Sequence, residues 1–80
     1  MTEPYRPIPC ETHAEYELAI MHRTRLAMRW RDATGAEHHA RVLPLDTEAT
    51  ADKEEYLVVE RENGQRERIR LDRILEANPA

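Results

Sequence analysis

Residues 55–71 decide the fold: EYLVVERENGQRERIRL. Apolar residues recur at every second position on both sides of Asn63-Gly64, which is the pattern of two half-buried β-strands joined by a tight turn. Asn-Gly favours a two-residue type I′ turn, because that turn needs positive φ at both central positions. We therefore predict a β-hairpin with strands over residues 55–61 and 65–71 and with an inward row of Leu57, Val59, Ile69 and Leu71.

Further strands lie on either side of this hairpin. In residues 24–31 apolar side chains alternate with arginines, and after a turn at Asp32–Gly35 a second strand is expected over residues 37–43. From Pro44 to Lys53 the sequence is polar and shows no periodicity, so we expect a loop of about ten residues there. A brief last strand is expected at about residues 73–76.

The segment before these strands has a helical pattern. Thr12 and Glu15 have the spacing of a capping box, in which each side chain accepts a hydrogen bond from the other residue's backbone N–H. We expect a helix over about residues 12–21. Its apolar side, which we expect to pack against the sheet, consists of Cys10, Ala14, Leu18 and Met21.

One helix and about five short antiparallel strands predict a mainly β protein with a single domain over residues 1–80. A small closed or nearly closed barrel is expected, because an open sheet of this size would leave long unpaired edges. The predicted core consists of Ile8, Leu18, Leu26, Met28, Trp30, Val42, Leu57, Val59, Ile69, Leu71 and Ile74.

The charge distribution favours a basic partner. The 80 residues carry a net charge of −4, whereas general nucleic-acid binders normally carry a basic surplus that neutralises phosphates. Residues 1–22 and residues 46–55 are acidic, and they flank a basic stretch at residues 23–31. Two separate acidic blocks favour a protein with a basic binding surface as the partner.

The sequence has no pattern typical of a catalytic, metal or cofactor site. His38 and His39 are adjacent on a predicted strand and point to opposite faces, and Cys10 lies beside Glu11, which disfavours a thiolate. A short chain also has little room for a deep catalytic cleft. We therefore expect a protein that is not an enzyme and holds no metal or cofactor. The sequence has a single cysteine and no signal-peptide pattern, so we expect a cytoplasmic protein. It has no apolar stretch long enough to span a membrane.

The arginine-rich strands suggest an alternative, a small barrel that binds RNA directly. The outward arginines are expected to be Arg25, Arg29, Arg31, Arg66, Arg68 and Arg70. RNA-binding barrels usually expose aromatic side chains for base stacking, but Trp30 is expected to point inward. Pairing with Glu37, Glu60 or Glu67 on neighbouring strands would also neutralise much of this face.

The chain contains four motifs that together cover most of the domain: YRPIPCE at residues 5–11, YELA at 16–19, EYLVVE at 55–60 and IRLDRI at 69–74. In this order, and at nearly this spacing, they resemble the Rho-binding antiterminators. The resemblance implies an Sm-like barrel with an N-terminal helix. It also implies a protein that binds the N-terminal domain of the hexameric Rho helicase, blocks its primary RNA-binding site and so competes with RNA. We expect the protein to act as a monomer.

The resemblance also implies where Rho is contacted. In the family, acidic and aromatic positions of the first helix and the loop before the third strand make the contact. The corresponding residues here are Glu11, His13, Ala14, Glu15 and Glu17 in the helix and Asp52 and Lys53 in the loop. Tyr16, beside Glu15 and Glu17, is a further candidate for the contact with Rho. The family commonly carries an aromatic residue followed by an acid where this chain has His13-Ala14. The loop before the third strand is also longer and more acidic here.

Overall fold

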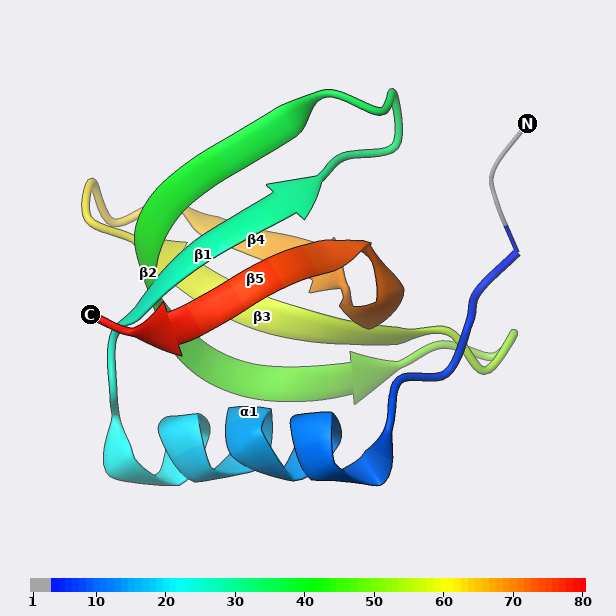
Figure 1. The fold of residues 1–80 in the computed structure, drawn as a ribbon, viewed down its shortest axis with the longest axis horizontal. Coiled ribbons are helices and arrows are strands. Elements are labelled where there is room, and N and C mark those ends of the chain that lie inside the picture. The colour runs from blue at the N-terminus through cyan, green and yellow to red at the C-terminus, as the bar shows by residue number, and fades with distance from the viewer. Residues whose placement is uncertain (1–3) are drawn as a thin grey trace.

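The computed structural model describes residues 4–80, which contain one α-helix and five β-strands. The helix lies along one side of a strongly curved sheet (Figure 1). In chain order the elements are α1 (Cys10–His22), β1 (Leu26–Arg31), β2 (Glu37–Ala49), β3 (Glu55–Arg61), β4 (Arg66–Arg70), the 3-10 turn η1 (Leu71–Arg73) and β5 (Ile74–Pro79).

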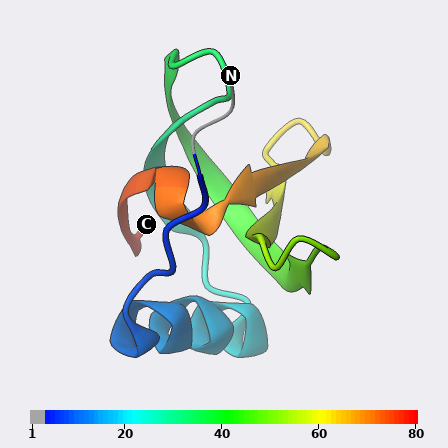
Figure 2. The same ribbon diagram turned by 90° about the vertical axis from the view of Figure 1, so that its right-hand side faces the viewer.

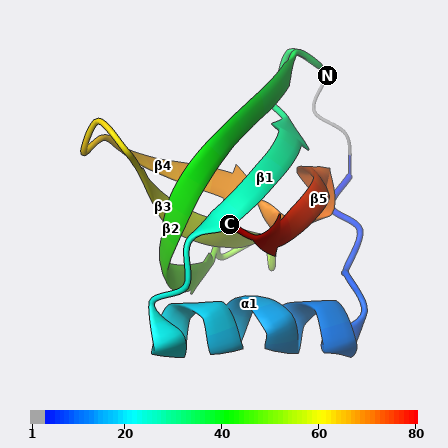
Figure 3. The same cartoon turned by 60° about the vertical axis from the view of Figure 1, so that its left-hand side comes forward.

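The strands form one antiparallel sheet in the order β4-β3-β2-β1-β5. β2 is the long central strand, and its first half pairs with β1 while its second half pairs with β3. The register shifts between Pro44 and Asp46, which leaves Leu45 as a bulge. A bulge bends a strand and increases its twist. The β1–β2 and β3–β4 hairpins accordingly point in different directions (Figures 2 and 3).

The predicted mainly β fold with an N-terminal helix is confirmed, but closure of the sheet is not. Within residues 4–80 no strand pairing joins β4 to β5, so the sheet is open at these two edges. The predicted loop over residues 44–53 is wrong, because β2 continues to Ala49. The bulge at Leu45 shifts the alternation of inward and outward side chains by one residue. The second half of β2 therefore does not continue the two-residue pattern of its first half.

The three hairpin turns have the same geometry. In each, a backbone N–H donates to the carbonyl three residues earlier, over 3.0 Å from Gly35 to Asp32, 3.0 Å from Lys53 to Thr50 and 2.8 Å from Gly64 to Arg61. The donating residue has positive φ in each case, 87° at Gly35, 62° at Lys53 and 86° at Gly64. The Asn63-Gly64 hairpin is thus confirmed, but the type I′ turn is wrong, since φ is positive at Gly64 and not at Asn63. A three-residue loop with a left-handed third residue takes its place.

The core lies between the sheet and one side of α1. Its buried apolar residues are Tyr16, Ala19, Leu26, Met28, Trp30, Val42, Leu57, Val59, Ile69 and Leu71, with Ile8 and Ile74 partly buried against them. The predicted core is therefore confirmed except for Leu18, with Ile8 and Ile74 only partly buried. The predicted packing side of α1 is wrong, because Cys10, Ala14, Leu18 and Met21 are all exposed. The helix packs through the nearly opposite side, because α1 carries apolar residues on both sides.

The ends of α1 explain its position. Pro9 is the N-cap residue and makes no side-chain capping bond, so the predicted Thr12–Glu15 capping box is wrong and the helix begins two residues earlier than expected. At the other end Arg23 is left-handed with φ 52°, and the backbone N–H of Thr24 donates to the Ala19 carbonyl over 2.9 Å. This pairing is a Schellman motif, which stops the helix and turns the chain into β1.

Candidate functional site

The side of α1 that faces away from the sheet is exposed along its whole length. Glu11, Ala14 and Glu15 occupy its N-terminal half, and Leu18 and Met21 occupy its C-terminal half. Neither Glu11 nor Glu15 forms an ion pair with any residue in 4–80. Two uncompensated carboxylates one turn apart on a rigid helix create a local negative potential. We call this side of α1 the helix face.

His13 connects the helix to the sheet. Its Nδ1 lies 3.1 Å from a carboxylate oxygen of Glu17, and its Nε2 lies 3.0 Å from one of Glu55 at the start of β3. The ring is partly buried, whereas the Glu17 side chain stays more than half exposed. His13 therefore holds α1 against β3, while the carboxylates of Glu17 and Glu55 on its two sides remain accessible to solvent.

The β2–β3 turn lies at the N-terminal end of α1 (Figure 1). The backbone N–H of Thr50 donates to the Glu54 carbonyl over 2.9 Å, and the N–H of Glu54 donates to Thr50 Oγ1 over 3.2 Å. Asp52 and Lys53 are exposed at the tip. Because Glu55 contacts His13, the structure brings this turn and the first turns of α1 together.

Tyr16 does not lie on the helix face. Its side chain is 6% exposed and packs into the core, and burial raises the pKa of its hydroxyl, with a further contribution from the negative charge of Glu15. The other predicted contact residues divide into exposed carboxylates, the bridging His13, and the turn residues Asp52 and Lys53.

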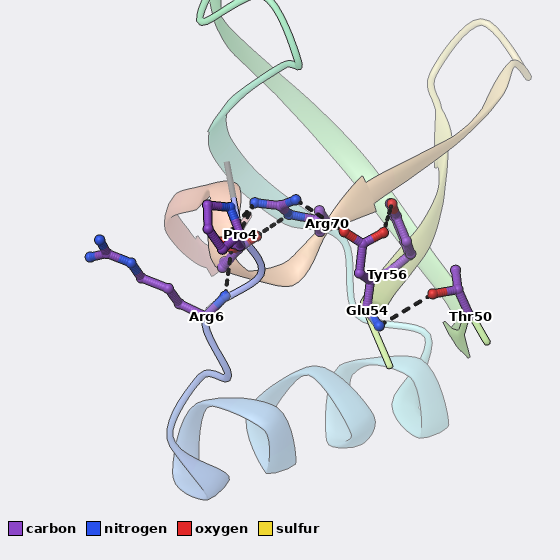
Figure 4. A network of polar contacts seen from close by, with 7 residues as sticks. Pro4, Arg6, Thr50, Glu54, Tyr56 and Arg70 are labelled. Carbon is purple, nitrogen blue, oxygen red and sulfur yellow. Dashed lines mark hydrogen bonds and ion pairs between the residues drawn. The ribbon is translucent and has the colours of Figure 1, made fainter. Parts of the chain in front are cut away.

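A buried arginine fixes both parts of this surface. Arg70 is 2% exposed, and its guanidinium donates to both carboxylate oxygens of Asp72, over 2.6 Å and 2.9 Å. It also donates to Glu54 over 3.3 Å and to the Pro4 carbonyl over 3.5 Å (Figure 4). The backbone N–H of Arg6 donates to Asp72 over 2.9 Å. The network ties the segment that leads into α1 and the end of the β2–β3 turn to η1.

Arg70 corrects the sequence prediction, which placed it on the outward face with Arg66 and Arg68. It is the last residue of β4 and still pairs with Tyr56 in the ladder. Its side chain is buried because Asp72, Glu54 and the chain at Pro4 contact the guanidinium on that face of the sheet. The hydrogen bonds to Asp72 raise the pKa of the Arg70 guanidinium further above its ordinary value. The Arg-x-Asp spacing of residues 70–72 is the signal in the sequence that indicates this pair.

Most other strand arginines pair with carboxylates across the sheet. The predicted partners are confirmed: Arg29 contacts Glu37 at 2.7 Å, Arg61 contacts Glu67 at 2.8 Å and Arg66 contacts Glu60 at 3.7 Å. Further pairs join Arg68 to Glu48 and Arg41 to Glu62. Trp30 is 2% exposed, as predicted, and Arg61 covers its ring, while Arg68 covers Tyr56. Among the strand arginines of residues 4–80, Arg31 forms no ion pair.

These features define a small mainly β domain with an N-terminal helix that exposes carboxylates and apolar side chains together. Residues 7–80 match the family described as Modulator of Rho-dependent transcription termination (ROF). The chain belongs to this family, and the resemblance found in its sequence motifs is confirmed.

One other comparison describes the fold and not the function. The chain is similar to part of the solved structure of Proteasome accessory factor B/C (PafBC) of Arthrobacter aurescens, with a TM-score of 0.77 and 18% sequence identity. The likeness covers 98% of this chain and 13% of that one, so it shows a shared domain fold alone. No curated protein matches the chain significantly. Within residues 4–80 no helix is long and apolar enough to cross a bilayer.

Proposed function

We propose that the protein binds the N-terminal domain of Rho through the helix face and the β2–β3 turn, and that it thereby blocks the primary RNA-binding site. The observation that carries this proposal is the pair of exposed, uncompensated carboxylates of Glu11 and Glu15. Membership of a family of modulators of Rho-dependent termination supports Rho as the partner. The protein acts as a cytoplasmic monomer that occupies a site and catalyses no reaction.

The physical basis is charge complementarity. A site that holds RNA phosphates must be basic, and carboxylates can occupy it in place of phosphates. The carboxylates of Glu11 and Glu15 start from a folded helix, which lowers the entropy lost on binding. His13 joins that helix to β3 through Glu55, so α1 and the β2–β3 turn meet the partner as one unit. Attraction between such surfaces speeds association and weakens as salt rises.

Direct binding to RNA by an Sm-like module is the second candidate. The observation that favours it is the exposure of Arg25 and Arg31, which form no ion pair within residues 4–80. RNA-binding barrels stack bases on exposed aromatic rings, whereas here Trp30 is buried and Arg68 lies over Tyr56. These contacts favour the first proposal over this one.

Competition with RNA tests the proposal. Rho is loaded with fluorescently labelled oligocytidylate, and the protein is titrated in while anisotropy is followed. We expect displacement of the RNA at low salt and weaker displacement as salt rises. Absence of displacement at low salt would contradict the proposal. A mobility shift of RNA by the protein alone, without Rho, would support the second candidate instead.

A further inference from the structure

The helix face changes character along its length. Its N-terminal half is acidic, with Glu11 and Glu15, whereas in its C-terminal half Leu18 is 53% and Met21 is 74% exposed. These four residues lie on one side of α1, because they are spaced by three or four positions. Large apolar side chains gathered next to polar groups on a surface are typical of interaction sites. The acidic charge alone does not account for them.

Leu18 also forms part of a groove. The groove lies between α1 and the end of β5, has a volume of about 460 Å³, and is continuous with the helix face through Glu15. Figures 1 and 3 show the end of β5 above the C-terminal half of α1. The apolar part of its lining consists of Tyr16, Leu18, Ala19, Leu26, Ala77 and Pro79. A side chain of aromatic size fits such a space.

We infer that this groove, together with Leu18 and Met21, takes an apolar or aromatic side chain from the RNA-binding site of Rho, an inference that rests on the proposed function. Sites for single-stranded RNA combine cationic side chains that hold phosphates with aromatic side chains that stack on bases. The helix face is complementary to both, since its carboxylates match the cations and its groove matches the rings. The acidic rim at Glu15 selects a ring or aliphatic side chain that has basic neighbours.

This arrangement divides the affinity into two parts with different salt dependence. Contacts of Glu11 and Glu15 weaken as salt screens the charges. Burial of Leu18 and Met21 depends on removing apolar surface from water, which moderate salt does not screen. Both parts compete with RNA, because each occupies a place that the nucleotide would otherwise fill.

The test is the double variant Leu18→Ser/Met21→Ser, with affinity for Rho measured at several salt concentrations. Both side chains are more than half exposed, so the fold is retained, which circular dichroism and thermal unfolding verify. We expect affinity to fall about tenfold or more at every salt concentration, with an unchanged salt slope. The matched control is Leu75→Ser, because Leu75 is 42% exposed on β5 and does not line the groove. This control is expected to bind like the wild type.

The outcomes separate the inference from the proposed function. If the wild type does not bind Rho, the proposed function fails. If the wild type binds Rho and the double variant binds equally tightly, the proposed contact through Glu11 and Glu15 is retained, whereas the inference about the groove is overturned. If sedimentation shows that the wild type self-associates through Leu18 and Met21, the groove is an interface between copies, which also overturns the inference.

Discussion

The helix face and the strands of the sheet both carry many charges, but they differ in how those charges are paired. Arg29, Arg41, Arg61, Arg66 and Arg68 each contact a carboxylate, and Arg70 is buried against Asp72. On α1, by contrast, Glu11 and Glu15 have no ion-pair partner within residues 4–80.

From this difference we infer that the density of charged residues in a sequence does not by itself identify a binding surface. The arginine-rich strands resemble an RNA surface when read along the chain, yet cross-strand partners satisfy most of these cations. The helix has fewer charges, and the carboxylates of Glu11 and Glu15 among them have no ion-pair partner within residues 4–80. Predictions that separate paired from unpaired charges therefore test the account.

The largest effect is expected where a paired charge is buried. Arg70→Ala leaves the carboxylates of Asp72 and Glu54 without their buried cation and releases the segment at residues 4–6. Removing one partner of a buried pair is expected to lower the free energy of unfolding by about 3–5 kcal/mol. Urea unfolding followed by Trp30 fluorescence measures it, with Arg66→Ala as the exposed control. Equal small losses in both variants would show that the network does not stabilise the fold.

A smaller effect is expected in the β2–β3 turn. Lys53 has φ 62° where the two equivalent turns have glycine. Lys53→Gly removes the cost of a left-handed conformation but adds freedom to the unfolded chain, so we expect a net gain of at most about 1 kcal/mol. The reverse control is Gly64→Lys, where a Cβ would meet nothing within 4 Å, so its loss is conformational. Thermal unfolding that moves both variants in the same direction would contradict the shared turn geometry.

A still smaller effect is expected for an exposed pair. Arg68→Ala removes the contact with Glu48 at 2.9 Å and the stacking over Tyr56, but both partners stay solvated. The free energy of unfolding is expected to fall by less than about 1 kcal/mol, and Rho binding is expected to stay unchanged. Chemical unfolding and RNA displacement measure the two quantities. A large loss of Rho affinity would move the contact to the sheet.

The pH dependence of stability isolates one paired acid, with the smallest expected effect. Hydrogen bonds with His38 and with Thr34 hold the pKa of the Asp32 carboxyl well below its ordinary value of 3.8. Because the pKa is lower in the folded state than in the unfolded state, the ionised carboxylate stabilises the fold at pH values above the unfolded-state pKa. This stabilisation is lost as the pH falls toward the folded-state pKa. Asp32→Asn is therefore expected to be less stable than the wild type at neutral pH, with the difference shrinking below pH 3.8. A constant difference in unfolding free energy across this range would contradict the role of the charge.

The sequence predicted those parts of the fold where one periodicity acts without interruption. Leu57, Val59 and Ile69 are buried as expected, because the β3–β4 ladder keeps one register over its whole length. Leu71 is also buried, although it lies in η1 and not in a strand. The second half of β2 was not predicted as a strand, because the single extra residue at Leu45 shifts the alternation of inward and outward side chains.

The candidate site was predictable in composition but not in orientation. The exposure of Glu11, Glu15, Asp52 and Lys53 agrees with the expected surface. Because α1 carries apolar residues on both sides, periodicity alone could not tell that Tyr16 faces the core and Leu18 faces solvent. The bridge from His13 to Glu55 depends on how the β2–β3 turn folds back onto the helix, which no local pattern encodes.

The most direct test of the account compares charge reversal on the two surfaces. Glu11→Lys/Glu15→Lys reverses unpaired carboxylates on the helix face, and Arg66→Glu/Arg68→Glu reverses arginines that the sheet already pairs. Rho affinity is measured for both by displacement of labelled oligocytidylate. We predict that the helix variant loses about tenfold or more in affinity and that the sheet variant binds like the wild type. Unchanged binding by the helix variant, or loss of binding by the sheet variant alone, would contradict the account.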